Sequence, residues 1–293
     1  MPEVELSAGV IEYEDTGGGG PVIVLLHGLL MDGSEWRHVV ADLRADYRCV
    51  APTLPLGSHR RPMKHDADLS LLGMVGLIAE FLERLDLHDV TLVGNDWGGP
   101  QLLVSIRRDE RVGRLVLCSC EAFDNYPPGL PGHMIWYAAK LPGGINAALQ
   151  PLRLRPLRRL PITLGWMSKR VSDETLDRWF APALAQRAIR RDLKKYAGSL
   201  PLRGRKPFLL ELAERQRSFK RPVLVVWGSE DRVMGPAHGR RLAALFPDAR
   251  LVEIPDSYVM MPEDQPAALT AAIREFLEVT EQRLSLARPD GPS

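Results

Sequence analysis

Residues 90–99 read VTLVGNDWGG, and this stretch decides the fold. The apolar run 90–93 is typical of a strand that is buried on both faces, and a helical pattern follows to about Arg108. Glycines at 94, 98 and 99 permit a sharp turn from strand to helix, because small residues avoid clashes around a strained apex. We therefore predict that the side chain at the apex, Asp96, projects over the carboxyl ends of the strands.

Strand and helix patterns alternate on both sides of this turn. Residues 5–13 are expected to form a hairpin with a turn at Ala8-Gly9. Further strands are expected at 22–26, 48–51, 115–118, 223–227 and 249–254, and helices at 34–44, 70–85 (capped by Ser70), 237–245 and 266–284. Such alternation implies right-handed crossovers and a mostly parallel central sheet with helices on both faces. The fold class is therefore α/β.

The alternation stops between residues 121 and 217, where prolines, arginines and short helical patterns prevail. This segment is too long for an ordinary loop, so we predict a helical cap inserted into the core. The predicted organisation is a first core part at 1–120, the cap at 121–217, a second core part at 218–284 and a C-terminal tail at 285–293.

Composition excludes several classes of function. The 293 residues carry 38 Lys and Arg against 37 Asp and Glu, so a net charge of +1 gives no argument for nucleic acid or a membrane surface as partner. Cys49, Cys118 and Cys120 suit neither a disulfide framework nor a zinc site, which favours reduced thiols in the cytoplasm. We see no signal peptide, no P-loop, no dinucleotide-binding glycine pattern and no metal-ligand cluster. We expect a small-molecule substrate without a cofactor or metal, and the sequence does not indicate an oligomeric state.

The turn at 94–98 fits the pattern G-x-nucleophile-x-G, with Asp96 in the nucleophile position. Upstream, His27-Gly28-Leu29 follows the strand 22–26, where the backbone N–H of Leu29 could serve as an oxyanion donor. Downstream, Asp231 follows the strand 223–227 and is the candidate for the acid that orients a catalytic imidazole. Glu230 and Glu121 are weaker candidates for this acid.

With these motifs the chain resembles the α/β-hydrolase superfamily, and within it the branch of haloalkane dehalogenases and epoxide hydrolases. The resemblance extends from about residue 5 to 284 and is least specific in the cap. It implies that Asp96 attacks an sp³ carbon to form an alkyl ester, which a histidine-activated water then hydrolyses. It also implies that Trp97 helps to hold a leaving halide.

The sequence departs from this family pattern in three places. The histidine expected seven residues before Pro266 is replaced by Val259, and no histidine follows His238. Leu29 stands where dehalogenases commonly have an asparagine, and Leu30 where epoxide hydrolases commonly have a proline. Epoxide hydrolases also use cap tyrosines, for which Tyr126, Tyr137 and Tyr196 are candidates, although each is favoured as a packing residue.

Other histidines could replace the missing one. A structural role that holds the turn is favoured for His27, and structural or solvated roles for His59, His65 and His238. His133 is the preferred substitute, because the cap should overhang the site. The arginine- and lysine-rich cap stretches 153–159 and 187–195 are favoured as a solvated lid surface, with steering of an anionic substrate as the alternative.

Three hypotheses remain open from the sequence. The chain is a hydrolase with Asp96 as nucleophile and an atypical or absent histidine. Alternatively, it is a lyase, isomerase or cyclase that uses Asp96 as acid or base, in which case no ester forms and no histidine is needed. Finally, it is a ligand-binding relative without catalysis.

Overall fold

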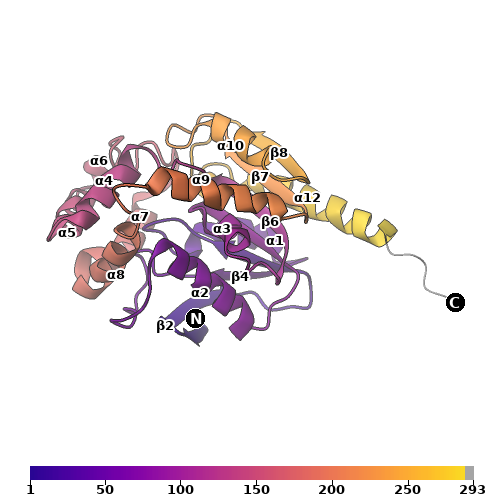
Figure 1. Cartoon of the computed structure of the whole chain (residues 1–293), viewed down its shortest axis with the longest axis horizontal. Coiled ribbons are helices and arrows are strands. Elements are labelled where there is room, and N and C mark those ends of the chain that lie inside the picture. Colours follow the sequence, from indigo (N-terminus) through magenta and orange to yellow (C-terminus); the bar gives the residue numbers. More distant parts are fainter. Residues whose placement is uncertain (288–293) are drawn as a thin grey trace.

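The computed structural model describes residues 1–287 and contains one eight-stranded sheet (Figure 1). The strand order is β1-β2-β4-β3-β5-β6-β7-β8. All neighbours from β4 to β8 in this order are parallel, whereas β1 pairs antiparallel with β2 and β2 pairs antiparallel with β4. The predicted α/β fold is confirmed. The strands are β1 (Glu3–Leu6), β2 (Gly9–Asp15), β3 (Val22–Leu26), β4 (Arg48–Pro52), β5 (Val90–Asp96), β6 (Val112–Cys120), β7 (Val223–Gly228) and β8 (Ala249–Ile254).

Helices cover both faces of the sheet and bury two apolar clusters. One face packs against α1 (Arg37–Leu43) and α12 (Pro266–Ala287). The other face packs against α2 (Leu71–Arg84), α3 (Gly99–Ser105), α9 (Arg205–Arg215) and α10 (Pro236–Ala243). Burial on both faces explains why the central strands are continuous apolar runs rather than alternating ones.

The helical insertion lies between β6 and β7 and gathers at one end of the sheet (Figure 1). Because α9 packs against α3, the last helix of the insertion lies in the core layers. We use the word cap for residues 129–204. The cap helices are α4 (Gly129–Lys140), α5 (Gly144–Leu149), α6 (Arg155–Arg158), α7 (Asp173–Ala185) and α8 (Arg187–Ala197), with the 3₁₀ turn η2 (Gln150–Arg153) between α5 and α6.

Several element boundaries differ from those expected. The helix expected at 34–44 is a 3₁₀ turn, η1 (Gly33–Trp36), followed by α1, because Asp32 accepts a hydrogen bond from the N–H of Ser34 and caps the turn. The helix α3 ends at Ser105 and Arg107 has a positive φ of 57°, so the helix does not reach Arg108. Ser70 caps α2, since its hydroxyl accepts a hydrogen bond of 3.2 Å from the N–H of Gly73.

The end of the chain also differs from the expected boundary. The helix α12 continues to Ala287, so the first three residues of the expected tail are helical. The remainder of that tail, 288–293, lies outside the described residues. Two further short elements complete the fold, η3 (Gln216–Ser218) and α11 (Met261–Asp264).

Candidate active site

The sharp turn at the end of β5 places Asp96 at its apex. Asp96 has a φ of 60°, a left-handed conformation that is unusual for a residue with a side chain. A Cβ at Gly94 would lie 2.4 Å from the Cγ of Pro100, and one at Gly98 would lie 2.2 Å from the carbonyl oxygen of Glu121. The two glycines are therefore required by close approach, and the predicted strand–turn–helix geometry is present.

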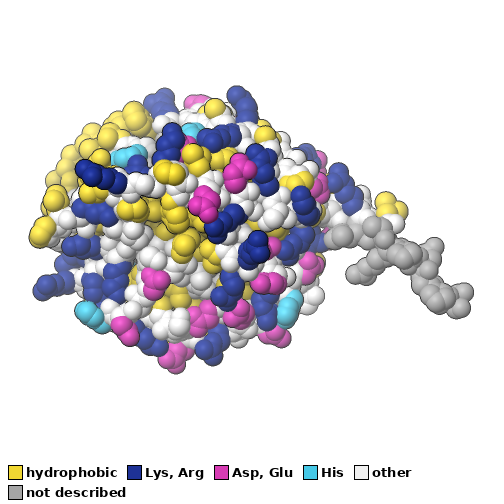
Figure 2. Space-filling view, in the orientation of Figure 1, with side chains coloured by type: hydrophobic (Ala, Val, Ile, Leu, Met, Phe, Trp, Pro, Cys, Tyr) yellow, Lys and Arg dark blue, Asp and Glu magenta, His cyan; other side chains and the backbone are white. Residues whose placement is uncertain are grey.

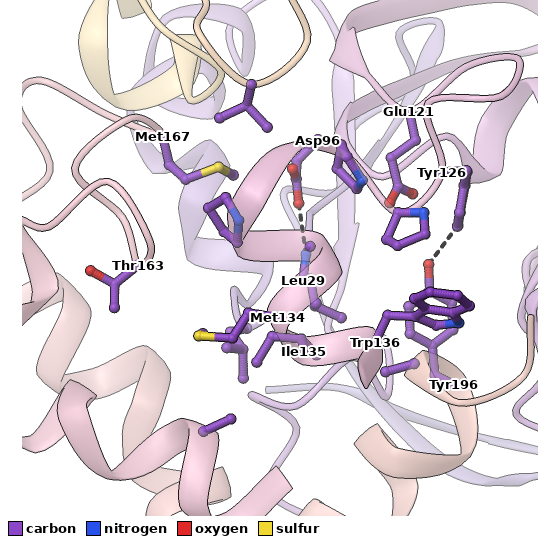
Figure 3. A pocket seen from close by; sticks show the side chains of 18 of the residues that line it. Leu29, Asp96, Glu121, Tyr126, Met134, Ile135, Trp136, Thr163, Met167 and Tyr196 are labelled. Carbon is purple, nitrogen blue, oxygen red and sulfur yellow. Dashed lines mark hydrogen bonds between the residues drawn. The ribbon is translucent and has the colours of Figure 1, made fainter. Parts of the chain in front are cut away.

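The carboxylate of Asp96 faces the space beneath the cap (Figure 3). Its Oδ2 accepts a hydrogen bond of 3.0 Å from the N–H of Leu29, whereas its Oδ1 accepts none from the residues of the described part of the chain. A Cβ at Gly28 would lie 2.4 Å from this Oδ2, so only glycine permits the contact. The N–H of Trp97 donates to the carbonyl of Asn95 at 2.6 Å, so Leu29 is the donor that holds the carboxylate.

Asp231 lies in the loop that follows β7 and is 5% exposed. Its Oδ1 accepts hydrogen bonds of 2.8 Å from the N–H groups of Val233 and Met234. Its Oδ2 is buried, and the neighbouring Ser119 hydroxyl does not complete a hydrogen bond to it. One oxygen of this carboxylate therefore lacks the donor that a catalytic imidazole would supply.

Val259 lies directly behind the turn. Its carbonyl accepts a hydrogen bond of 2.8 Å from the side-chain amide of Asn95, and its side chain is fully buried. None of the seven histidines of the chain forms a hydrogen bond with Asp96 or Asp231 in the described structure. The position expected for the histidine is thus filled by an aliphatic side chain.

A cavity of about 100 Å³ separates Asp96 from the cap and is mainly apolar. Two tyrosines bring hydroxyl groups to its wall (Figure 3). The Tyr126 hydroxyl accepts a hydrogen bond of 2.7 Å from the indole N–H of Trp97 and lies 2.5 Å from the Tyr196 hydroxyl. The cavity is lined by Leu29, Leu30, Glu121, Met134, Ile135, Trp136, Ile162, Thr163, Leu164, Met167 and Val233, among others.

The comparisons with known proteins agree with this geometry. The family model described as alpha/beta hydrolase fold matches residues 21–266. The chain belongs to this family. Haloalkane dehalogenase 2 of Mycobacterium tuberculosis (strain ATCC 25618 / H37Rv) is 29% identical over 280 residues, which is 92% of each chain. The haloalkane dehalogenase of Mesorhizobium japonicum is 22% identical and covers 94% of this chain and 90% of its own.

Solved structures of hydrolases share the fold. The haloalkane dehalogenase DbeA from Bradyrhizobium elkani has a TM-score of 0.75 at 19% identity, covering 96% of this chain and 97% of its own. A thermophilic esterase from Thermogutta terrifontis has a TM-score of 0.68 at 22% identity, covering 96% and 99%. The resemblance to the dehalogenase-like branch is confirmed, and these similarities support a hydrolase.

Four buried carboxyl groups surround the site of this hydrolase. Burial raises the pKa of Asp96 to about 7, and the Asp231 carboxylate adds to this while the Leu29 N–H opposes it. Burial raises the pKa of Asp231 to about 6. Burial and the charge of Asp96 together hold the pKa of Glu35 and of Glu121 well above the usual range. The pKa values of all four carboxyl groups are thus raised, and that of Asp96 lies near neutral pH.

The weaker sequence candidates have different surroundings. His27 is fully buried; its Nδ1 donates to the Gly28 carbonyl at 2.8 Å and its Nε2 accepts from the N–H of Leu54. Burial lowers its pKa to about 4, so it is a neutral side chain that holds the turn. His133 donates through Nδ1 to the Gly129 carbonyl within α4 and does not line the cavity.

Two aromatic candidates are also placed by the structure. Tyr137 is 56% exposed and its ring contacts Trp136, so it is not brought to the cavity. Trp97 is buried, and its indole N–H donates a hydrogen bond to the hydroxyl of Tyr126. A halide could use this indole only if Tyr126 moved away from it.

Sequence reasoning missed Glu35. This side chain is fully buried below the turn at Gly28, whose N–H donates to its Oε2 at 3.3 Å. Its sequence context, GSEW at the start of a helix, resembles an ordinary exposed first turn, so only the tertiary structure reveals the burial.

No group of three or more potential metal ligands is found among residues 1–287. Cys49, Cys118 and Cys120 are buried free thiols. Within the same residues, no helix combines the length and the apolar character needed to cross a bilayer.

The raised pKa of Asp96 predicts a pH-dependent effect on stability. The folded state holds this proton more tightly than the unfolded chain, whose ordinary Asp pKa is 3.8, so the stabilisation is complete below pH 3.8 and is lost as the pH rises through about 7. Asp96→Asn cannot ionise and should therefore be more stable than the wild type at pH 8.5 by about 2–4 kcal/mol, with little difference at pH 4.5. Urea unfolding of both proteins at the two pH values measures this. An equal difference at both pH values would contradict it.

Proposed function

We propose that the protein is a hydrolase that opens a small, apolar epoxide by nucleophilic attack of Asp96. The observation that carries the proposal is that the unbonded Oδ1 of Asp96 and the hydroxyls of Tyr126 and Tyr196 adjoin the same apolar cavity. A nucleophile and a proton donor on one small cavity suit a substrate whose leaving oxygen stays attached to the molecule.

In the first step, Oδ1 of Asp96 forms a bond to one ring carbon and the bond from that carbon to the ring oxygen breaks. The N–H of Leu29 holds Oδ2 and thereby fixes the direction of attack. Of the two hydroxyl protons of Tyr126 and Tyr196, one lies between the two oxygens and the other is available to the ring oxygen. The product of this step is a β-hydroxy ester of Asp96.

After ring opening, the tyrosine pair has given up one proton and must be reprotonated. Glu121 lines the same cavity, and burial together with the charge of Asp96 raises its pKa well above the usual range, which favours its protonated form. It lies close enough to interact with the Tyr126 hydroxyl. Glu121 can therefore return a proton to the tyrosine pair after ring opening.

In the second step, water attacks the ester carbonyl of Asp96 and a base accepts one water proton. The bond between the carbonyl carbon and Oδ1 then breaks, and the leaving alkoxide takes that proton to complete the diol. Asp96 is left as a carboxyl group that carries the water oxygen and the second water proton. The charge that develops on Oδ2 is stabilised by the N–H of Leu29. The free Oδ2 of Asp231 is the candidate base, but its pKa of about 6 makes it a weak one. We therefore expect ester hydrolysis to be slower than ester formation.

Dehalogenation is the second candidate, because the relatives named above are haloalkane dehalogenases. Against it, the Trp97 indole N–H is bonded to Tyr126, and Leu29 offers no side-chain donor for a halide. A departing halide would leave into an apolar cavity with little to stabilise its charge.

A comparison of matched electrophiles tests the proposal. We expect the purified protein to consume a short 1,2-epoxyalkane at least about tenfold faster than the 1-bromoalkane of equal chain length, by gas chromatography. Tyr126→Phe should lower epoxide consumption by about 10²-fold and leave bromoalkane consumption nearly unchanged.

The exposed Tyr137 provides the control, since Tyr137→Phe should alter neither rate. Faster consumption of the bromoalkane, or an equal effect of Tyr126→Phe on both substrates, would favour dehalogenation instead.

A further inference from the structure

The net charge of +1 is the sum of two strongly charged parts. The cap, residues 129–204, contains 14 Lys and Arg and 4 Asp and Glu, which gives +10. The rest of the chain contains 24 Lys and Arg and 33 Asp and Glu, which gives −9. The excess of positive charge is thus carried by the cap and the excess of negative charge by the rest of the chain.

The cap also carries the exposed apolar side chains. Apart from Met1 and Leu286 near the ends of the described chain, every exposed large hydrophobic side chain lies in the cap. Figure 2 shows hydrophobic side chains gathered along the edge of the molecule formed by the cap, with Lys and Arg beside them. An apolar patch of this kind on a soluble fold marks an interaction surface. The exposed apolar side chains of the cap include Leu130, Tyr137, Leu141, Leu154, Leu160 and Leu202, which are 43–62% exposed.

Cations line a cleft between α5 and α8, in the same cap. Arg187, Arg190, Arg191 and Lys194 line it together with backbone and side chains of residues 143–146. Arg191 is paired with the buried Asp192, and Arg190 donates to carbonyls at the end of α7. Arg187 and Lys194 are exposed and form no ion pair with any residue from 1 to 287. Their charges are therefore available to an external anion.

We propose that the cap binds peripherally to an anionic phospholipid bilayer. The apolar side chains would enter the acyl boundary, and the cations of the α8 cleft would contact lipid phosphates. This is the combination by which interfacial proteins bind membranes, and neither part alone gives stable attachment. Peripheral binding requires no spanning helix.

The arrangement links this surface to the cavity above Asp96. Ile162 lies in the same cap, is 39% exposed and also lines the cavity. The adjoining Thr163 and Leu164 line the cavity as well. A bilayer bound at this edge would bring apolar molecules to the wall of the catalytic cavity. If Asp96 acts as proposed, we therefore expect its substrates to be lipophilic.

Vesicle flotation tests membrane binding directly. We expect the full-length protein to float with phosphatidylcholine vesicles that contain phosphatidylglycerol, to bind pure phosphatidylcholine at least about tenfold more weakly, and to be released by high salt. Arg187→Glu/Lys194→Glu should lower the affinity by at least about tenfold. Leu154→Ser/Leu160→Ser, on the apolar part, should lower it independently.

The matched control is Arg44→Glu/Lys220→Glu, which makes the same charge change at exposed positions of the core that form no ion pair with residues 1–287. We expect it to bind vesicles as the wild type does. Absence of flotation, equal binding to neutral vesicles, an equal loss in the control pair, or displacement by inorganic phosphate at constant ionic strength would each overturn the proposal. Asp96→Asn should float normally, so failure of the catalytic proposal and failure of this one are distinguishable.

Discussion

Asp96→Asn should abolish epoxide opening, with a loss of at least about 10³-fold in rate. The amide has the shape of the carboxylate and can still accept a hydrogen bond from the N–H of Leu29, but it is neutral and a poor nucleophile. In the wild type, intact-protein mass spectrometry of an acid-quenched reaction should show an increase equal to one epoxide molecule. Peptide mapping should place the added mass on Asp96.

Asp231→Asn is the matched control for this substitution. It also replaces a buried carboxylate of the site by its amide, yet it leaves the proposed nucleophile intact. We expect the ester to form at nearly the wild-type rate in this variant and to persist longer. An adduct on another carboxyl group, or ester formation that survives Asp96→Asn, would refute the role of Asp96.

The pH dependence of ester formation tests independently whether Asp96 acts in its ionised form. Because ionised Asp96 is the nucleophile, the rate should rise with pH and level off above the Asp96 pKa of about 7. A rate that falls with rising pH would indicate that protonated Asp96 acts as an acid. That outcome would favour the lyase, isomerase or cyclase hypothesis, in which no ester forms.

The sequence was sufficient to predict the fold and the frame of the site. The steric cause of Gly94 is local in the chain, because its Cβ would meet Pro100, whereas that of Gly98 is the carbonyl of Glu121. Both glycines nevertheless occupy the spacing of the strand–turn–helix motif, from which the turn and the position of Asp96 were predicted. The Leu29 N–H was also predictable, because it depends on a turn directly after β3. The absence of the histidine was also predictable, because the position seven residues before Pro266 is occupied by Val259.

The proton donors could not be predicted in this way. The Tyr126–Tyr196 contact joins the loop after β6 to α8, across 70 residues, and a tyrosine in a cap segment is more often a packing residue. The bond that takes the Trp97 indole N–H depends on the same tertiary contact. The charge separation between the cap and the rest of the chain was not predicted for a different reason, because a net charge of +1 does not show how the charges are distributed along the chain.

Val259→His should convert slow ester hydrolysis into rapid turnover, with an increase of about 10²–10⁴ in the rate of this step. The buried Oδ2 of Asp231 accepts no hydrogen bond from residues 1–287, and an imidazole at 259 could donate one N–H to it while its other nitrogen activates water. Steady-state diol formation measures the gain, and the ester seen in the wild type should no longer accumulate. Val259→Phe, a ring without nitrogen, should give no gain.

The fully buried Val259 leaves little room for a larger ring, so the histidine variant could destabilise the fold by overpacking. Val259→Ala avoids this difficulty, because it creates a space behind the turn that imidazole added to the buffer can enter. Its ester hydrolysis should then increase with imidazole concentration, whereas the wild type, with that space filled, should not respond. If the wild type already hydrolyses its ester as fast as it forms, a group other than the residue at 259 activates the water and the weak-base role of Asp231 must be abandoned.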